Sequence, residues 1–278
     1  MGEHQDLLKT AIEAARAGAA IVMKAHGTGR AIPYTLKGQN DFVTAVDRES
    51  EAAVVKTIRS RYPDHGILAE ESAASDPGGS IRWIIDPLDG TTNFIHGFPV
   101  FSISVAAARS RPGGSTGDDV VAGVVYDPLR EELFTAVRGE GAFLNGTRLQ
   151  VTGREDLAGA LLATGFPVRE KRLVKIYLRI FEDLHNATQG IRRAGSAAID
   201  LAYTACGRVD GFFEMGLSPW DIAAGSLLIT EAGGAVRDFG GGTEYLASGH
   251  VVAGAQGIAK SLVEFIARHY PGEAAGAK

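Results

Sequence analysis

The segment 83–93 constrains the fold more than any other part of this 278-residue chain. It reads Trp-Ile-Ile-Asp-Pro-Leu-Asp-Gly-Thr-Thr-Asn, so an apolar stretch ends in two carboxylates that lie three residues apart. The apolar stretch predicts a strand, Pro87 stiffens its exit, and Gly90 permits a sharp turn. The chain must therefore fold so that one strand delivers Asp86 and Asp89 together at its carboxyl end.

Two converging carboxylates have two explanations. Hard cations such as Mg²⁺ take oxygen ligands from one or two carboxylates and complete their shell with carbonyls, waters and phosphate oxygens. The backbone carbonyl of Leu88 could join such a shell. Asp, Pro and Gly are also the commonest turn residues. The pair by itself leaves a metal site and an ordinary turn both open.

Three further acidic positions occur in similar settings. Asp47 lies in the first turn of a predicted helix, Glu70 follows a predicted strand, and Asp221 follows Ser-Pro-Trp at a predicted helix start. Each also has a structural explanation, because Asp47 and Asp221 fit helix capping and Glu70 fits a solvated loop. Taken singly, none of them identifies a metal site.

Composition favours a globular protein that acts on small molecules. The chain is 45% hydrophobic and 22% charged, and its net charge of −5 is spread without a basic stripe. This weighs against nucleic-acid and membrane partners. No stretch approaches the roughly 18 apolar residues of a membrane span, and the N-terminus lacks a secretory signal pattern. The lone cysteine, Cys206, fits a reducing, cytoplasmic location.

The first half of the chain predicts a mostly antiparallel sheet with helices. Apolar periodicity predicts helices from Leu7 to Ala25 and from about Thr44 to Arg61. Strands are expected at 66–69, 81–85, 101–105, 120–126 and 132–137. The segment 109–119, rich in Gly and Ser, predicts a hairpin loop rather than a domain boundary.

The second half predicts α/β layering. We expect strands at 159–163 and 251–254 and helices at 170–185, 196–206, 219–232 and 256–270. The expected organisation is a single domain over 1–270, with subdomains of roughly 1–150 and 151–270, and a frayed tail at 271–278.

The acidic positions and their flanks form an ordered series of motifs. They read Asp-Phe-Val-Thr-Ala-Val-Asp at 41–47, Ala-Glu-Glu-Ser at 69–72, the segment 83–94, Arg-Ala-Gly-Ser-Ala-Ala at 193–198, Gly-Arg-Val-Asp-Gly-Phe-Phe-Glu at 207–214 and Pro-Trp-Asp-Ile-Ala-Ala-Gly at 219–225. This series resembles the inositol monophosphatase family, in particular its bacterial extragenic-suppressor (SuhB-like) branch. The resemblance extends from the first helix to about Ile266. It implies a layered α+β sandwich of the sugar-phosphatase (inositol monophosphatase/fructose-1,6-bisphosphatase) type.

The resemblance also implies a site and a mechanism. Two or three Mg²⁺ ions, or Mn²⁺, would be held by Glu70, Asp86, the Leu88 carbonyl, Asp89 and Asp221. A water made more acidic by the cation would attack phosphorus. Thr91 and Glu70 would orient that water, and Asp47 would accept a hydrogen bond from the Thr91 hydroxyl.

Substrate contacts follow from the same resemblance. The expected substrate-binding residues are Asp89, Gly90, Thr91, Thr92, Gly195, Ser196, Glu214 and Asp221. The amides of 90–92 would contact phosphate at a helix start. Gly195, Ser196 and Glu214 would contact hydroxyl groups of the substrate.

The expected activity is Mg²⁺-dependent hydrolysis of a small sugar or polyol phosphate, with myo-inositol 1-phosphate as first choice. Related folds that hydrolyse fructose 1,6-bisphosphate, histidinol phosphate or 3′-phosphoadenosine 5′-phosphate keep broad specificity open. A protein-interaction module of the transcription machinery is the alternative from another class. Lithium inhibition and a homodimer are also expected from the resemblance.

Overall fold

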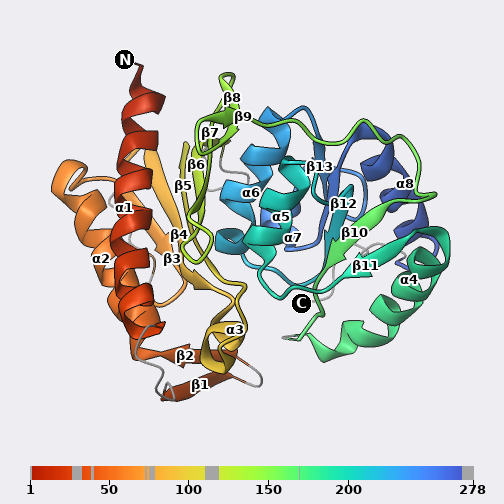
Figure 1. Ribbon diagram of the computed structural model, residues 1–278, viewed down its shortest axis with the longest axis horizontal. Helices are drawn as coiled ribbons and strands as arrows, with labels where there is room; N and C mark the ends of the chain where they lie inside the picture. Colours follow the sequence, from red (N-terminus) through yellow and green to blue (C-terminus); the bar gives the residue numbers. More distant parts are fainter. Residues whose placement is uncertain are drawn as a thin grey trace.

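Two β-sheets alternate with three layers of helices in the computed structural model of the protein (Figure 1). The structure describes residues 2–26, 33–38, 41–72, 74, 79–109, 119–168 and 170–270. The helices are α1 (Glu3–His26), α2 (Ala45–Arg61), α3 (Thr91–His96), α4 (Val174–Ala187), α5 (Ala197–Ala205), α6 (Pro219–Glu231), α7 (Tyr245–Ser248) and α8 (Gln256–Ala267), with a 3₁₀ turn, η1 (Lys171–Leu173), before α4.

The larger sheet has seven strands in sequence order. They are β3 (Gly66–Ala69), β4 (Ile81–Asp89), β5 (Ser102–Arg109), β6 (Asp119–Asp127), β7 (Glu132–Val137), β8 (Gly141–Leu144) and β9 (Thr147–Arg148). Only the β3–β4 pair is parallel within this sheet, so the predicted mostly antiparallel arrangement is confirmed. Strand β5 is buried along nearly its whole length, because helices cover both faces of the sheet.

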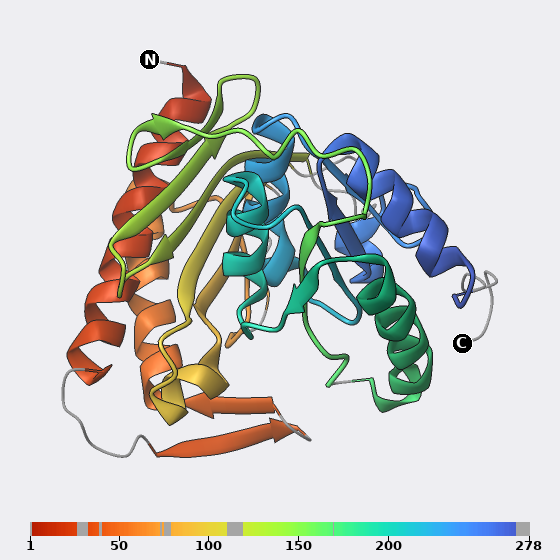
Figure 2. The same ribbon diagram turned by 45° about the vertical axis from the view of Figure 1, so that its right-hand side comes forward.

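The smaller sheet has five strands in the order β11-β10-β12-β14-β13. Their bounds are β10 (Leu161–Thr164), β11 (Gly190–Arg192), β12 (Gly211–Glu214), β13 (Ala235–Arg237) and β14 (Val251–Gly254). Strand β10 pairs in parallel with both β11 and β12. A separate hairpin of β1 (Tyr34–Gly38) and β2 (Asp41–Thr44) lies below the larger sheet in Figure 2.

Three apolar clusters hold these layers together. One lies between the larger sheet and α1 with α2, and another between the smaller sheet and α4 with α8. The third surrounds α5 and α6, which lie between the two sheets (Figure 1). Helix α6 is buried without a break from Asp221 to Ile229, as a helix enclosed on all sides must be. The predicted layered α+β fold class is therefore confirmed.

Several predicted boundaries differ from the observed ones. The 170–185 helix begins as a 3₁₀ turn and the 256–270 helix ends at Ala267. The sequence reading missed the β1–β2 hairpin and strands β8, β9, β11, β12 and β13, which are two to five residues long and carry little periodicity. The loop within 109–119 joins antiparallel neighbours as expected, but residues 110–118 and the predicted tail at 271–278 lie outside the described residues. The subdomain division stays a prediction.

No helix among the described residues has the length and apolar character needed to cross a membrane. The layered arrangement brings the ends of several helices and strands together. The carboxyl end of β4 meets the starts of α2, α3, α5 and α6 and the end of β12, through the contacts described next.

Candidate functional site

A bulge at the end of β4 directs the side chains of its two aspartates toward the same region. Asp86 pairs with Ser104 of β5 and Asp89 with Ser102, so three steps on β4 face two on β5. Pro87 has no N–H to give to the sheet and fits at such an irregularity. The Leu88 N–H donates to Asp86 Oδ1 at 3.0 Å, which fixes the turn between the two carboxylates.

Asp221 of α6 completes a cluster of buried acids. Asp86, Asp89 and Asp221 each offer a carboxylate oxygen, and these oxygens lie within 4.8 Å of one another. Their side chains are only 1%, 9% and 7% exposed. An all-oxygen set of this kind matches the ligand preference of Mg²⁺ and Mn²⁺ rather than that of Zn²⁺.

Burial and mutual repulsion raise the pKa values of this cluster. Burial, followed by the charges of Glu70, Asp89 and Asp221, raises the pKa of Asp86 well above its usual range. Burial raises the pKa of Asp89 to about 6, although hydrogen bonds from Ser196 and Ala198 oppose the shift. Buried like charges are costly without a cation, so the residues present fit a metal centre.

Thr91 and Asp47 lie beside this cluster and are hydrogen-bonded to each other. The Thr91 hydroxyl is 2.8 Å from Asp47 Oδ1 and 3.1 Å from the Leu88 carbonyl oxygen. Asp47 Oδ2 accepts from the N–H and the hydroxyl of Thr44, at 2.8 and 2.5 Å, and so caps α2. The charged and nearer Asp47 oxygen takes the single Thr91 hydroxyl hydrogen, which leaves the Thr91 lone pairs free to accept.

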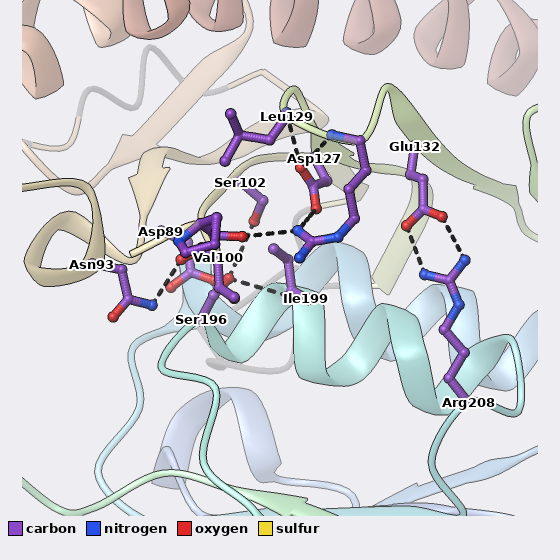
Figure 3. A network of polar contacts seen from close by, with 12 residues as sticks. Asp89, Asn93, Val100, Ser102, Asp127, Leu129, Glu132, Ser196, Ile199 and Arg208 are labelled. Carbon is purple, nitrogen blue, oxygen red and sulfur yellow. Dashed lines mark hydrogen bonds and ion pairs between the residues drawn. The ribbon is translucent and has the colours of Figure 1, made fainter. Parts of the chain in front are cut away.

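Asp89 also links the larger sheet to the middle helices. Its Oδ2 accepts from Ser196 Oγ at 2.5 Å, and both residues are drawn in Figure 3. The same oxygen accepts from the Ala198 N–H at 2.8 Å, at the start of α5. The Asn93 side-chain amide donates to the carbonyls of Val100 and Ala194 at 2.7 and 2.9 Å. These contacts hold the 194–196 turn against β4 and α3.

A cavity of about 340 Å³ opens at this junction. Of the residues predicted from the sequence, Glu70, Asp86, Leu88, Asp89, Gly90, Thr91, Thr92, Gly195, Ser196, Glu214 and Asp221 line it. Asp47 does not line the cavity; it is 1% exposed and reaches the site through Thr91. The structure therefore brings all of these residues into one place, while their individual roles stay predictions.

Gly90 and Ser196 explain how two helix starts face the cavity. Gly90 has a φ of 94° as the N-cap of α3, a left-handed conformation that glycine adopts without strain. Ser196 is the N-cap of α5 and its hydroxyl accepts from the Ile199 N–H at 3.4 Å. Free N–H groups at such starts can bind anions.

Sequence reasoning missed several residues of the cavity. Gly165, Phe166 and Arg193 line it, and the Arg193 guanidinium lies 5.2 Å from the centre of the Phe166 ring. Arg193 belongs to the quoted 193–198 motif, so its position two residues before Gly195 was a usable signal. Phe166 follows β10. The strands that pair with β10 are too short for local periodicity to identify, so nothing in the sequence indicated that Phe166 lies at the cavity.

Two further buried acids add to the negative charge around the cavity. Glu214 at the end of β12 is 9% exposed, and Asp200 in α5 is 3% exposed. Burial is the main reason that the pKa values of both are raised. The negative charge of Asp200 raises the pKa of Glu214 further, and that of Asp89 raises the pKa of Asp200 further. Asp200 lies one helical turn after Ser196, a spacing that could have pointed to it.

Fold and site together define a class: layered α/β proteins with a buried carboxylate centre in a cleft between two sheets. The sequence profile of the inositol monophosphatase family matches residues 3–271. The chain is 50% identical over 261 residues to Nus factor SuhB of Pasteurella multocida, covering 94% of this chain and 95% of that protein. It is 49% identical over 258 residues to Nus factor SuhB of Escherichia coli K12, covering 92% and 94%.

Solved structures of related proteins have the same fold. The extragenic suppressor protein SuhB of Bartonella henselae superposes with a TM-score of 0.88 at 37% identity, covering 95% of this chain and 100% of that one. Inositol monophosphatase from Anabaena superposes with a TM-score of 0.82 at 37% identity, covering 96% and 97%. The chain belongs to the inositol monophosphatase family, as the motif series predicted.

Proposed function

We propose that the protein is a Mg²⁺-dependent phosphatase that hydrolyses a small sugar or polyol phosphate, with myo-inositol 1-phosphate as the first candidate. The observation that carries this proposal is the cluster of Asp86, Asp89 and Asp221 at the floor of a cavity of about 340 Å³. The family to which the chain belongs supports phosphatase chemistry in general.

Glu70, Asp86, the Leu88 carbonyl, Asp89 and Asp221 would hold two or three Mg²⁺ ions, or Mn²⁺. Bound there, the cations supply positive charge to phosphoryl oxygens and lower the pKa of water. The amides of 90–92 bind phosphate oxygens at the start of α3. The ring hydroxyls of the substrate contact Gly195, Ser196, Glu214 and Asp221, which line the same cavity.

Thr91, Glu70 and Asp47 have the proposed role of preparing the attacking water. Because the Thr91 hydroxyl hydrogen is directed to Asp47 Oδ1, the Thr91 oxygen can accept a hydrogen bond from water. Glu70 then accepts the proton that the water loses on attack. Asp47 acts as a positioning residue, since its second oxygen is held by the cap of α2.

A substrate panel tests the proposal. Inositol 1-phosphate, fructose 1,6-bisphosphate, histidinol phosphate and 3′-phosphoadenosine 5′-phosphate are assayed with Mg²⁺ and with EDTA. We expect EDTA-sensitive phosphate release with the highest kcat/KM for inositol 1-phosphate. Preference for the nucleotide bisphosphate would assign another activity of this superfamily. Inhibition by Li⁺ is expected in the same assay, and light scattering tests the expected homodimer.

A second candidate function comes from the names of relatives. Proteins about half identical to this chain are named Nus factor SuhB, which favours a role with transcription partners and weakens the sequence-based expectation that nucleic acid plays no part. Asp86→Asn separates the two functions. Loss of a cellular phenotype together with hydrolysis supports the enzyme, and a phenotype that persists without hydrolysis supports the interaction module.

A further inference from the structure

Gly165 and Glu214 lie side by side at the carboxyl ends of neighbouring parallel strands. Strand β10 pairs with β12 in the register Thr164 with Phe213, and the next residue on each chain is Gly165 or Glu214. Side chains at matching positions of adjacent strands point to the same face of a sheet. A side chain at 165 would therefore compete with Glu214 for one space at the edge of the cavity.

The Glu214 carboxylate occupies that space. An ideal Cβ on Gly165 would lie 1.9 Å from Glu214 Oε1, 2.2 Å from Cδ and 2.3 Å from Oε2. Gly165 is not among the glycines with positive φ, so its backbone conformation is open to other residues. A side chain at 165 is therefore opposed by the neighbouring carboxylate, which would have to move, rather than by the local turn.

The strands around this pair are held together on both sides. On its other side Glu214 pairs with Val251 of β14, which is fully buried. The Thr164 hydroxyl lies 2.7 Å from the Phe213 carbonyl and 3.2 Å from the Tyr177 hydroxyl, which ties the ends of β10 and β12 together. A methyl group at 165 would therefore displace the flexible end of the Glu214 side chain rather than the strands.

The carboxylate is directed at the cavity. Glu214 and Gly165 both line it, and Glu214 is 9% exposed. Among the described residues none donates a hydrogen bond to its carboxylate, so its acceptor positions are available to a ligand. A buried carboxylate with free acceptor positions is suited to hydroxyl donors.

We propose that Gly165 is a positioning residue for specificity: its missing side chain lets the Glu214 carboxylate lie over the strand ends, where it accepts hydrogen bonds from substrate hydroxyls. This inference rests on the proposed polyol phosphatase function. It predicts that position 165 sets affinity for the polyol part of the substrate while the metal cluster, on β4 and α6, is left in place.

Gly165→Ala tests the inference with two substrates. For inositol 1-phosphate, KM rises by about tenfold or more, the loss expected for a hydrogen bond to a charged group, while kcat changes much less. For phenyl phosphate, which has no hydroxyl groups, KM stays within about twofold because no such bond is lost. Equal increases in KM for both substrates, or none for inositol 1-phosphate, would overturn the inference.

A double-mutant cycle tests whether the effect acts through Glu214. Glu214→Ala and the double variant Gly165→Ala/Glu214→Ala should have the same KM for inositol 1-phosphate, because the methyl group no longer displaces anything. If Gly165→Ala still raises KM in the Glu214→Ala background, the methyl group blocks substrate directly and the proposed positioning role is wrong.

A matched control and a structural readout complete the test. Gly153→Ala adds a methyl group where nothing lies within 4 Å and should leave KM unchanged. A crystal structure of Gly165→Ala should show the Glu214 carboxylate displaced, and an unmoved carboxylate would refute the positioning role even if no substrate were known. An inactive wild-type protein, in contrast, would count against the proposed function.

Discussion

Each aspartate of the site uses one carboxylate oxygen to hold backbone. Asp47 Oδ2 caps α2 while Oδ1 accepts from Thr91. Asp221 Oδ2 accepts the Ser218 N–H in the capping box of α6, and Asp86 Oδ1 accepts the Leu88 N–H. Capping and metal binding were alternative explanations for these residues, but a carboxylate has enough lone pairs for both. Fixing one oxygen orients the other.

Asp86→Asn should separate stability from function. An amide keeps an oxygen for the Leu88 N–H but removes a buried charge that Glu70, Asp89 and Asp221 repel. We expect the melting temperature of the EDTA-treated variant to rise by a few degrees above wild type. Stabilisation by Mg²⁺ and phosphate release should both be lost. A variant that still gains stability from Mg²⁺ would show that Asp86 is not a ligand.

Asp89→Asn would be a less selective test, because Asp89 Oδ2 also binds Ser196 and the α5 backbone.

Thr91→Val tests the proposed water-orienting group. Valine matches the shape of threonine but cannot bind water or Asp47, so kcat should fall by about 10²-fold or more. The melting temperature should also fall by a few degrees, because Asp47 Oδ1 loses its hydrogen bond while it stays buried. Thr91→Ser restores the hydroxyl and serves as the matched control, with most activity retained. If Thr91→Val keeps wild-type kcat, the hydroxyl has no part in the reaction.

At the scale of elements, the close crossing of α5 and α6 determines where two walls of the cavity lie. Helix α5 starts at Ser196 and α6 carries Asp221, both of which line the cavity. The helices pack at Gly225, where an added Cβ would lie 2.5 Å from Leu201 Cβ and 2.7 Å from Leu201 Cδ1. Their separation thus depends on one missing side chain.

Gly225→Ala should destabilise the protein although alanine is the better helix former. Propensity favours alanine by about 1 kcal/mol, whereas overpacking a core costs about 1–3 kcal/mol, so the net free energy of unfolding should fall. Urea denaturation measures it. Leu201→Ala in the same chain makes room for the methyl group, and the double variant should lose less than the sum of the two single losses. Strict additivity would show that the two residues do not conflict.

At the scale of the whole molecule, the site lies where the layers meet. Asp86 and Asp89 come from the larger sheet, Asp221 from the middle helices and Glu214 from the smaller sheet. A bidentate ion pair between Glu132 and Arg208 also joins β7 to the segment after α5 (Figure 3). A cation bound by Asp86, Asp89 and Asp221 would link the larger sheet to the middle helices, so metal binding should stabilise the whole protein.

The stability of the metal-free protein should depend on pH in a predictable direction. The pKa of Asp89 is about 6 in the folded protein, against an ordinary value of 3.8. The folded state therefore binds protons more tightly than the unfolded state, and this contribution to stability is lost as pH rises from about 4 through 6. In EDTA we expect a higher melting temperature at pH 5.5 than at pH 7.5. Asp86→Asn, with one acid fewer in the cluster, should show a smaller difference.

Mg²⁺ should reverse that trend. Cation binding requires ionised carboxylates, so the gain in melting temperature on adding Mg²⁺ should be larger at pH 7.5 than at pH 5.5. At about 100 times its dissociation constant, Mg²⁺ would stabilise by about 2.7 kcal/mol. Scanning calorimetry at the two pH values measures both effects. An equal gain at both would indicate that the cation binds away from these acids.

The sequence by itself determined the local features. The apolar run before Asp86, the capping pattern at Thr44 and Asp47, and the Ser-Pro-Trp-Asp start of α6 were readable because each depends on neighbours a few residues away. The motif series added the family. Long helices and long strands were placed within a few residues, whereas the short helix α7 and several strands of two to five residues were missed because they offer too short a pattern.

Only the tertiary structure decided which of these local features touch. The pairing of β10 with β12 places Gly165 beside Glu214, and the packing of α5 against β4 places Ser196 on Asp89 and brings Asp200 within electrostatic reach of Asp89. Such distances depend on strand order and helix packing between segments about 50 to 110 residues apart, which hydrophobic periodicity does not encode. The sequence thus supplied the carboxylates, and the fold brought them close enough to repel one another and to offer oxygens to a cation.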